Sequence, residues 1–239
     1  MSDQKEYYRD EEWWVSRCLG RTASQLNTWI GFSRHRGATL YNLKPHFDEE
    51  VVPGTNILLT GPPLTGKRSI MMDVLAAGTD RGDGSIIVTT KDSADRVLKD
   101  YQKRTPYEGK PVAVVDCVTR QQGVNDVRES DRIKYASSPV DMTGIGIKLS
   151  EFLQAFGDRG IDQNRVMVHS LSTLLMYSDL QTVFRFLHVF TGRIQSVNGL
   201  GLFSIDSTSH DDQSMNTLKQ LFDGVIKVPE DGDPEIRLA

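Results

Sequence analysis

From residue 56 onward, short apolar runs alternate with segments whose apolar residues recur every three or four positions. Uninterrupted runs of this length are typical of strands buried on both faces of a parallel sheet, and the recurring pattern predicts amphipathic helices. The expected strands cover residues 57–59, 86–88, 112–115, 166–168, 202–205 and 225–228. The expected helices include residues 94–101, 149–156, 180–187 and 215–222. Strand and helix in alternation predict an α/β fold with a doubly wound, mostly parallel sheet flanked by helices.

The helix expected over residues 180–187 has boundary signals at both ends. Ser178 and Gln181 form a capping-box pattern at its start. Asn198 followed by Gly199 is typical of the residues that end a helix.

The first 41 residues do not follow the alternation. They carry the aromatic pairs Tyr7-Tyr8 and Trp13-Trp14 among charged residues, and one short helix is predicted over residues 22–32. We expect an aromatic-rich N-terminal extension over residues 1–41 and a single domain over residues 42–239. The aromatic side chains either cover an edge of the chain's own core, the simpler interpretation, or form a surface for a partner or a second copy.

Composition narrows the classes of function. With 32 acidic against 28 basic side chains, the net charge of -4 gives no general attraction to nucleic acid or to anionic membranes. The two cysteines, Cys18 and Cys117, lack a metal-ligand spacing, which predicts free thiols in a reducing compartment and no zinc site. No apolar run approaches transmembrane length. We therefore expect a cytoplasmic protein that does not bind membranes.

A P-loop follows the first strand and opens a helix. Glycines at both ends of the loop let its backbone N–H groups point inward, the helix start adds its positive dipole end, and the lysine reaches the β- and γ-phosphates of a nucleotide. Such a loop predicts ATP or ADP as ligand. The residues expected to bind it are Gly61, Pro62, Pro63, Leu64, Thr65, Gly66, Lys67, Arg68 and Ser69.

Together with this loop, three further motifs carry a family resemblance. They are Val52-Pro53-Gly54 before the P-loop strand, Ser170-Leu171-Ser172-Thr173-Leu174 after the strand at 166–168, and the late Asp223-Gly224-Val225-Ile226. In this order they resemble RecA-superfamily ATPases of the KaiC and RadA type, most of all archaeal single-domain KaiC-like proteins. The resemblance covers about residues 42–228 and implies a RecA-like P-loop NTPase fold that assembles as a homo-oligomer.

Three departures from that family concern catalysis. Arg68 stands where the family has a hydroxyl for Mg²⁺, and His169 stands where it has the Walker B aspartate. The strand at 86–88 continues into Thr89-Thr90-Lys91, without the glutamate that activates water in the family. We therefore expect weak or absent hydrolysis, and nucleotide binding that depends little on Mg²⁺, since Arg68 adds a positive charge.

Two residues could replace the lost metal ligands. Ser69 lies one position after the usual hydroxyl, and Asp206 ends the strand expected beside the P-loop strand, although an aspartate there is more often a turn former. Other candidates have plain structural interpretations: His169 bonded to backbone rather than to a metal, and Asp116 at a strand end. Lys91 could point at the phosphates, although a solvated lysine is the more common case.

Nucleic acid binding is not indicated. The loop over residues 207–213, where recombinases of this superfamily contact DNA, has two aspartates and no lysine or arginine. Residues 120–134 mix basic and acidic side chains and predict a solvated or subunit-facing loop. The sequence thus indicates a nucleotide-binding regulatory or scaffolding protein with a protein partner or further copies of itself. An active Mg²⁺-dependent ATPase, a recombinase-accessory DNA-repair protein and a structural relic with no ligand stay open as alternatives.

Overall fold

The computed structural model describes residues 39–124 and 126–238, and the described residues from Leu40 onward belong to one compact unit. Two expectations, the aromatic pairs and the short helix at 22–32, lie outside the described residues. The boundary expected after residue 41 therefore stays a prediction.

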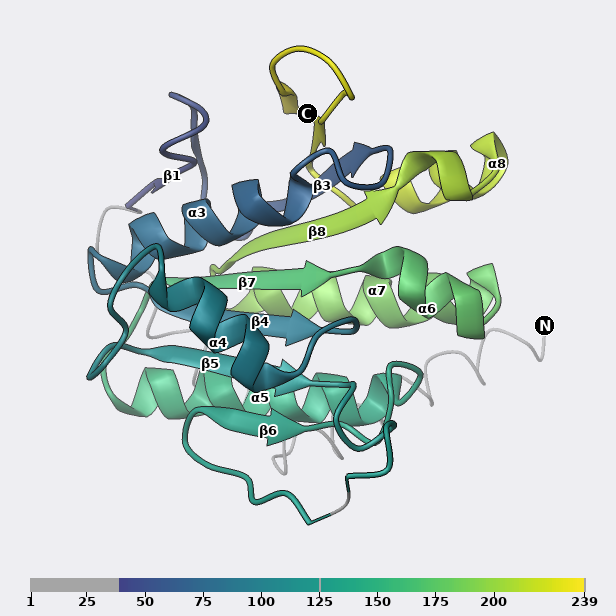
Figure 1. The fold of residues 1–239 in the computed structure, drawn as a ribbon. Helices are drawn as coiled ribbons and strands as arrows, with labels where there is room; N and C mark the ends of the chain where they lie inside the picture. Colours follow the sequence, from purple (N-terminus) through teal and green to yellow (C-terminus); the bar gives the residue numbers. More distant parts are fainter. Residues whose placement is uncertain (1–38, 125, 239) are drawn as a thin grey trace, which may run out of the picture. The chain divides into compact units, whose positions relative to one another are not determined.

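The predicted sheet is present, and its central strands are parallel (Figure 1). Its order is β10-β9-β3-β8-β7-β4-β5-β6, with only β10 antiparallel to its neighbour. Five of the six predicted apolar runs fall within a strand, and the sixth, residues 225–228, extends one residue past the end of β9. The strands concerned are β3 (Asn56–Gly61), β4 (Gly84–Thr89), β5 (Val112–Asp116), β7 (Asn164–His169), β8 (Leu200–Asp206) and β9 (Gly224–Lys227).

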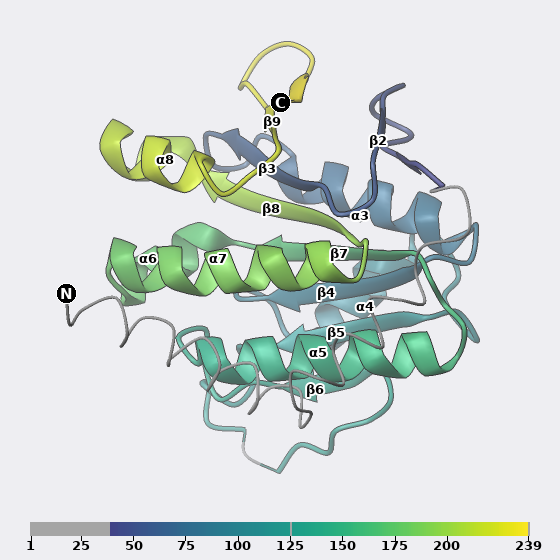
Figure 2. The ribbon, with the colours of Figure 1, turned by 180° about the vertical axis from the view of Figure 1, so that it is seen from behind.

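Helices cover both faces of the sheet. On one face α3 (Lys67–Thr79) and α4 (Ala94–Gln102) pack against alternate strand residues such as Ile57 and Leu59. On the other, which Figure 2 shows in front, α5 (Met142–Asp158) and α7 (Leu180–Ser196) pack against residues such as Leu58 and Phe203. Two helices are shorter, α6 (Leu171–Tyr177) and α8 (Asp212–Lys219). Two-sided burial explains why the strands are apolar without alternation. None of the helices in the described residues combines the length and hydrophobicity that crossing a bilayer requires.

The capping box expected at Ser178 is wrong, because the residue that caps α7 is Asp179. The Asp179 carboxylate accepts a hydrogen bond from the backbone N–H of Thr182, at 2.8 Å. Ser178 instead ends α6, and its N–H bonds to the Leu174 carbonyl. The predicted end at Asn198-Gly199 is confirmed, since α7 stops at Ser196 and Asn198 takes a left-handed conformation.

The hydrophobic pattern of the sequence did not predict the four shortest or most polar strands. Strand β6 (Ile133–Tyr135) pairs with β5 inside the stretch expected to be a loop, so that expectation is partly wrong. Arg132, just before β6, holds this strand near β5. Its guanidinium donates to the Val112 carbonyl at 2.9 Å and lies over the Tyr107 ring. Strand β10 (Glu235–Leu238) is half polar, and β1 (Tyr41–Asn42) and β2 (Glu50–Val51) have two residues each. Segments this short carry no period for a sequence pattern to detect.

A buried arginine joins several elements at the amino ends of the strands. Arg165 of β7 is fully buried, and its Nε donates to Asp83 Oδ2 at 2.8 Å. Its Nη1 donates to the carbonyl oxygens of Asn42 and Val74, both at 2.9 Å, which links β7 to β1 and α3. A Cβ at Gly78 would lie 2.2 Å from Arg165 Nε, so α3 can pass here only with a glycine.

We expect Asp83→Ala to lower the free energy of unfolding by about 3–5 kcal/mol, because it leaves a buried guanidinium without its counter-ion. Urea denaturation of the wild type and the variant measures the difference. The matched control is Arg237→Met, which breaks the exposed pair with Glu235 and should cost much less. Equal losses for the two variants would show that the buried pair has no special role.

Candidate functional site

The P-loop lies at the carboxyl end of β3, between this strand and α3. Strands β3 and β8 end in register, which places Asp206 opposite Gly61. A Cβ at Gly61 would lie 2.0 Å from the Val228 carbonyl oxygen, and Gly66 has a φ of 87°. Both positions therefore require glycine, the first for space and the second for its left-handed backbone.

The start of α3 is suited to an anion. No side chain caps it at Gly66, and its first turn contains no acidic residue. The first N–H groups of a helix have no partner within the helix, and they carry the positive end of its dipole. A phosphate group would satisfy both.

Lys67 lies back across the loop. Its side chain is 5% exposed, and Nζ donates to the carbonyl oxygens of Gly61, at 2.8 Å, and Pro62. The same Nζ is 3.0 Å from Asp206 Oδ1. The positive charge of the P-loop lysine is thus balanced by a carboxylate of the neighbouring strand.

Asp206 has a second cationic neighbour and a fixed backbone. Lys91 Nζ is 3.9 Å from Asp206 Oδ2. The backbone N–H of Asp206 donates to Ser172 Oγ at 2.9 Å, and this hydroxyl also lies 3.0 Å from His210 Nε2. Lys91 is therefore partly solvated, as expected, and also lies near a carboxylate. Its side chain remains half exposed.

Arg68 turns toward α4. Its guanidinium is hydrogen-bonded to the Asp100 carboxylate, and its Nε is 3.8 Å from Asp92 Oδ2. The Arg68 hydrogen bond holds the pKa of Asp100 below its usual range. The charge that we expected to serve a phosphate is already balanced by these two carboxylates.

The structure does not bring the two metal candidates together. Ser69 Oγ accepts from Arg104 Nη2 at 2.9 Å and lies 3.5 Å from Asp73 Oδ2, while Asp206 contacts Lys67. Among the described residues, no group of three His, Cys, Asp or Glu side chains is arranged to hold a metal ion. With Arg68 turned to α4, the residues present do not fit a P-loop Mg²⁺ site. Ser69 and Asp206 as metal ligands stay a prediction without support from these contacts.

His169 is a partly buried side chain that is neutral at pH 7. Its Nδ1 lies 2.8 Å from Ser204 Oγ, so its partner is a side chain of β8 and not the expected backbone group. Burial, with the positive charge of Lys91 second, lowers the pKa of His169 to about 3. At neutral pH this position supplies neither a carboxylate nor a positive charge.

The end of β4, which lacks the catalytic glutamate of the family, is hydrogen-bonded to the end of β7. Buried Thr90 donates from Oγ1 to the His169 carbonyl at 3.0 Å and accepts from the Ser170 N–H at 2.8 Å. Sequence reasoning missed this role, for which no motif gives a signal. The structural interpretation of Asp116 is confirmed, because its carboxylate accepts from the backbone N–H groups of Ala94 and Val118.

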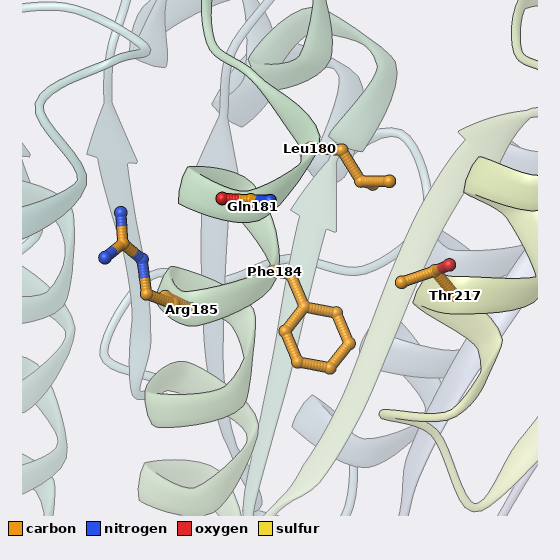
Figure 3. A pocket seen from close by; sticks show the side chains of 5 residues that line it. All are labelled: Leu180, Gln181, Phe184, Arg185 and Thr217. Atoms are coloured by element: carbon orange, nitrogen blue, oxygen red, sulfur yellow. The ribbon is translucent and has the colours of Figure 1, made fainter. Parts of the chain in front are cut away.

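A separate pocket of about 430 Å³ lies between α7 and α8 (Figure 3). The Phe184 ring points across it toward Thr217 of α8. None of its lining residues belongs to the P-loop site. They are Leu180, Gln181, Phe184, Arg185 and Thr217.

Comparison with known proteins agrees with the fold. The fold, a mostly parallel sheet with a P-loop after a central strand, is that of RecA/KaiC-like proteins. The chain belongs to a family described as "Family of unknown function (DUF7504)", whose model matches residues 54–228. No curated protein sequence matches the chain.

Two solved structures illustrate the likeness. One is the KaiC-like protein PH0186 from Pyrococcus horikoshii OT3, with a TM-score of 0.58 and 16% identity over 84% of this chain and 89% of that one. The other is the uncharacterized protein PH0321 from Pyrococcus horikoshii, in complex with an unknown peptide. Its TM-score is 0.55, with 12% identity over 77% of this chain and 83% of that one. Similarity at this level concerns the fold.

His169 should make stability depend on pH. Its pKa is about 3 in the folded protein and near 6.5 when unfolded, so between these values the unfolded state binds the extra proton. The stability of the folded state associated with neutral His169 is fully present above pH 6.5 and is lost as the pH falls toward 3. We expect His169→Asn, which can still bond to Ser204, to flatten the pH dependence of the free energy of unfolding over this window. Urea titrations at several pH values measure it, and parallel profiles for the two proteins would contradict the assignment.

Proposed function

We propose that this chain is a cytoplasmic ATP- or ADP-binding protein with a regulatory or scaffolding role, and that it hydrolyses nucleotide weakly or not at all. The observation that carries the proposal is that the P-loop keeps its phosphate-binding groups but lacks free side chains at its metal positions. Its lysine and uncapped helix start face the carboxyl end of the sheet, while the side chains at the metal positions are engaged elsewhere.

Binding is supported by position and by charge. Ligands of open α/β sheets bind beyond the carboxyl ends of the strands, where this loop lies. Lys67 already pairs with an anionic oxygen, that of Asp206. A phosphate oxygen that takes the place of this carboxylate leaves Lys67 with an equivalent anionic partner, so the buried ammonium group is not left unpaired.

Weak catalysis is supported by three side chains. Arg68 is paired with Asp100, His169 is neutral and bonded to Ser204, and Thr90 joins two strand ends. Phosphoryl transfer depends on charge neutralisation and on an oriented water, and one lost stabilising group costs about a hundredfold to a thousandfold in rate. Losses within one functional unit do not multiply, but their direction is the same.

The alternatives find less support. An active ATPase would need Ser69 and Asp206 to share a metal ion, yet their contacts lie on different elements. For a recombinase-accessory protein, the loop after β8 lacks cations, and its Asp211 is used to cap α8 through the Ser214 N–H. The PH0321 structure contains an unknown peptide. By analogy we extend the proposal to a protein partner or a homo-oligomer.

We expect ATP and ADP to bind equally well with Mg²⁺ and with EDTA, because no metal site completes the P-loop. Lys67→Ala should weaken binding at least about tenfold, since hydrogen bonds to charged groups contribute about 1.5–3 kcal/mol. Isothermal titration calorimetry measures both effects. Lys99→Ala, an exposed lysine of α4, is the matched control and should bind like the wild type. Loss of all binding on chelation would sink the metal-independent part of the proposal.

We expect steady-state phosphate release well below about one per second, an ordinary enzymatic rate. Arg68→Ser and His169→Asp together should raise Mg²⁺-dependent release more than the two single changes combined, because a metal ion needs both ligands. Thr90→Glu is not included, since it would break the bonds between β4 and β7. The single variants serve as controls for lost packing. Ordinary turnover by the wild type would show that other residues handle the metal.

A further inference from the structure

Resting on the nucleotide-binding function proposed above, we propose that Lys91 is a second phosphate-binding residue and that Asp206 is an internal counter-ion which the phosphates displace. The ligand class is a nucleoside di- or triphosphate bound without metal. Asp206 is then a competitor of the ligand and not a metal ligand.

The first step is the geometry around one carboxylate. Lys67 Nζ is 3.0 Å from Asp206 Oδ1, and Lys91 Nζ is 3.9 Å from Asp206 Oδ2. The two lysines come from different elements, the start of α3 and the loop after β4. They converge because β3, β8, β7 and β4 are successive neighbours in the sheet and end at the same edge. Two ammonium groups on opposite oxygens of one anion form a clamp.

The second step concerns how Lys91 is held. Thr90, before it, is bonded to the end of β7. Asp92, after it, exchanges hydrogen bonds with Thr89 Oγ1, at 2.8 Å from the Asp92 carbonyl and 3.1 Å from its N–H. With both flanking residues fixed, the backbone of Lys91 is positioned. Its side chain is 48% exposed, which leaves the ammonium group accessible to a ligand.

The third step is charge. Two lysines against one aspartate leave a net charge of about +1 at the clamp. Release of Asp206 raises the available charge to about +2, of which Lys67 supplies half as in any P-loop and Lys91 the other half. Lys91 can thus supply about half of the positive charge that a Mg²⁺ ion would bring, whereas Arg68 is paired with Asp100. Because Asp206 shares the sign of the phosphates, its charge lowers the affinity that the lysines would otherwise give.

The test is calorimetry with ATP, ADP and AMP in EDTA, on the wild-type chain and four variants. Lys91→Met should weaken ATP and ADP binding about fivefold, the size expected for a half-exposed charge contact. AMP binding should change least, because it has the fewest phosphates. Asp206→Asn, of the same shape without the charge, should strengthen ATP binding about fivefold. Lys99→Met on α4 controls for loss of a lysine and should leave binding unchanged.

The outcomes separate this inference from the proposed function. If neither the wild type nor Asp206→Asn binds any nucleotide, nucleotide binding itself is wrong. Should the wild type bind while Lys91→Met binds equally well, Lys91 is not a phosphate contact. Weaker binding by Asp206→Asn would overturn the counter-ion role and favour a ligand role for Asp206. Lys91→Gln, assayed beside Lys91→Met and with thermal melts of each variant, separates loss of charge from loss of folding.

Discussion

The pairing of Lys67 with Asp206 is the interaction on which the candidate site depends. The lysine side chain is almost fully buried, and a buried charge without a partner is costly. The partner comes from β8 because the register with β3 places Asp206 beside the end of the P-loop strand. Sheet topology, loop conformation and charge balance are therefore linked at one contact. A ligand that engages the loop must replace what this contact provides.

Much of the fold could be predicted from the sequence, for a physical reason. Strands buried on both faces must be apolar throughout, so the runs around Leu58, Val114 and Val166 were detectable one by one. The P-loop was detectable because its chemistry restricts residue types over a short span. The missed elements have neither property. β6 is held by pairing with β5 and by Arg132, and this information lies in contacts distant along the chain.

The candidate site was predicted in its list of residues but not in its contacts. Arg68 was expected to face the phosphates, yet its guanidinium is hydrogen-bonded to Asp100 in the last turn of α4. Lys91 was assigned to solvent, yet the sheet order brings it to Asp206. Ion pairs between segments 30 or more residues apart have no local signature. The register of the strands decides that Lys67 and Lys91 meet Asp206, and the contact between α3 and α4 decides that Arg68 meets Asp100.

The close approach of Gly61 to Val228 gives the P-loop a mechanical connection to the end of the chain. The Val228 carbonyl occupies the space that any side chain at Gly61 would need, and the Val228 N–H donates to the Thr60 carbonyl at 2.8 Å. The loop and the segment that leaves β9 are therefore in rigid contact at this point. Strand β10, antiparallel to β9, continues that segment. Any change of the loop that moved Gly61 toward Val228 would therefore also have to move the segment that joins β9 to β10.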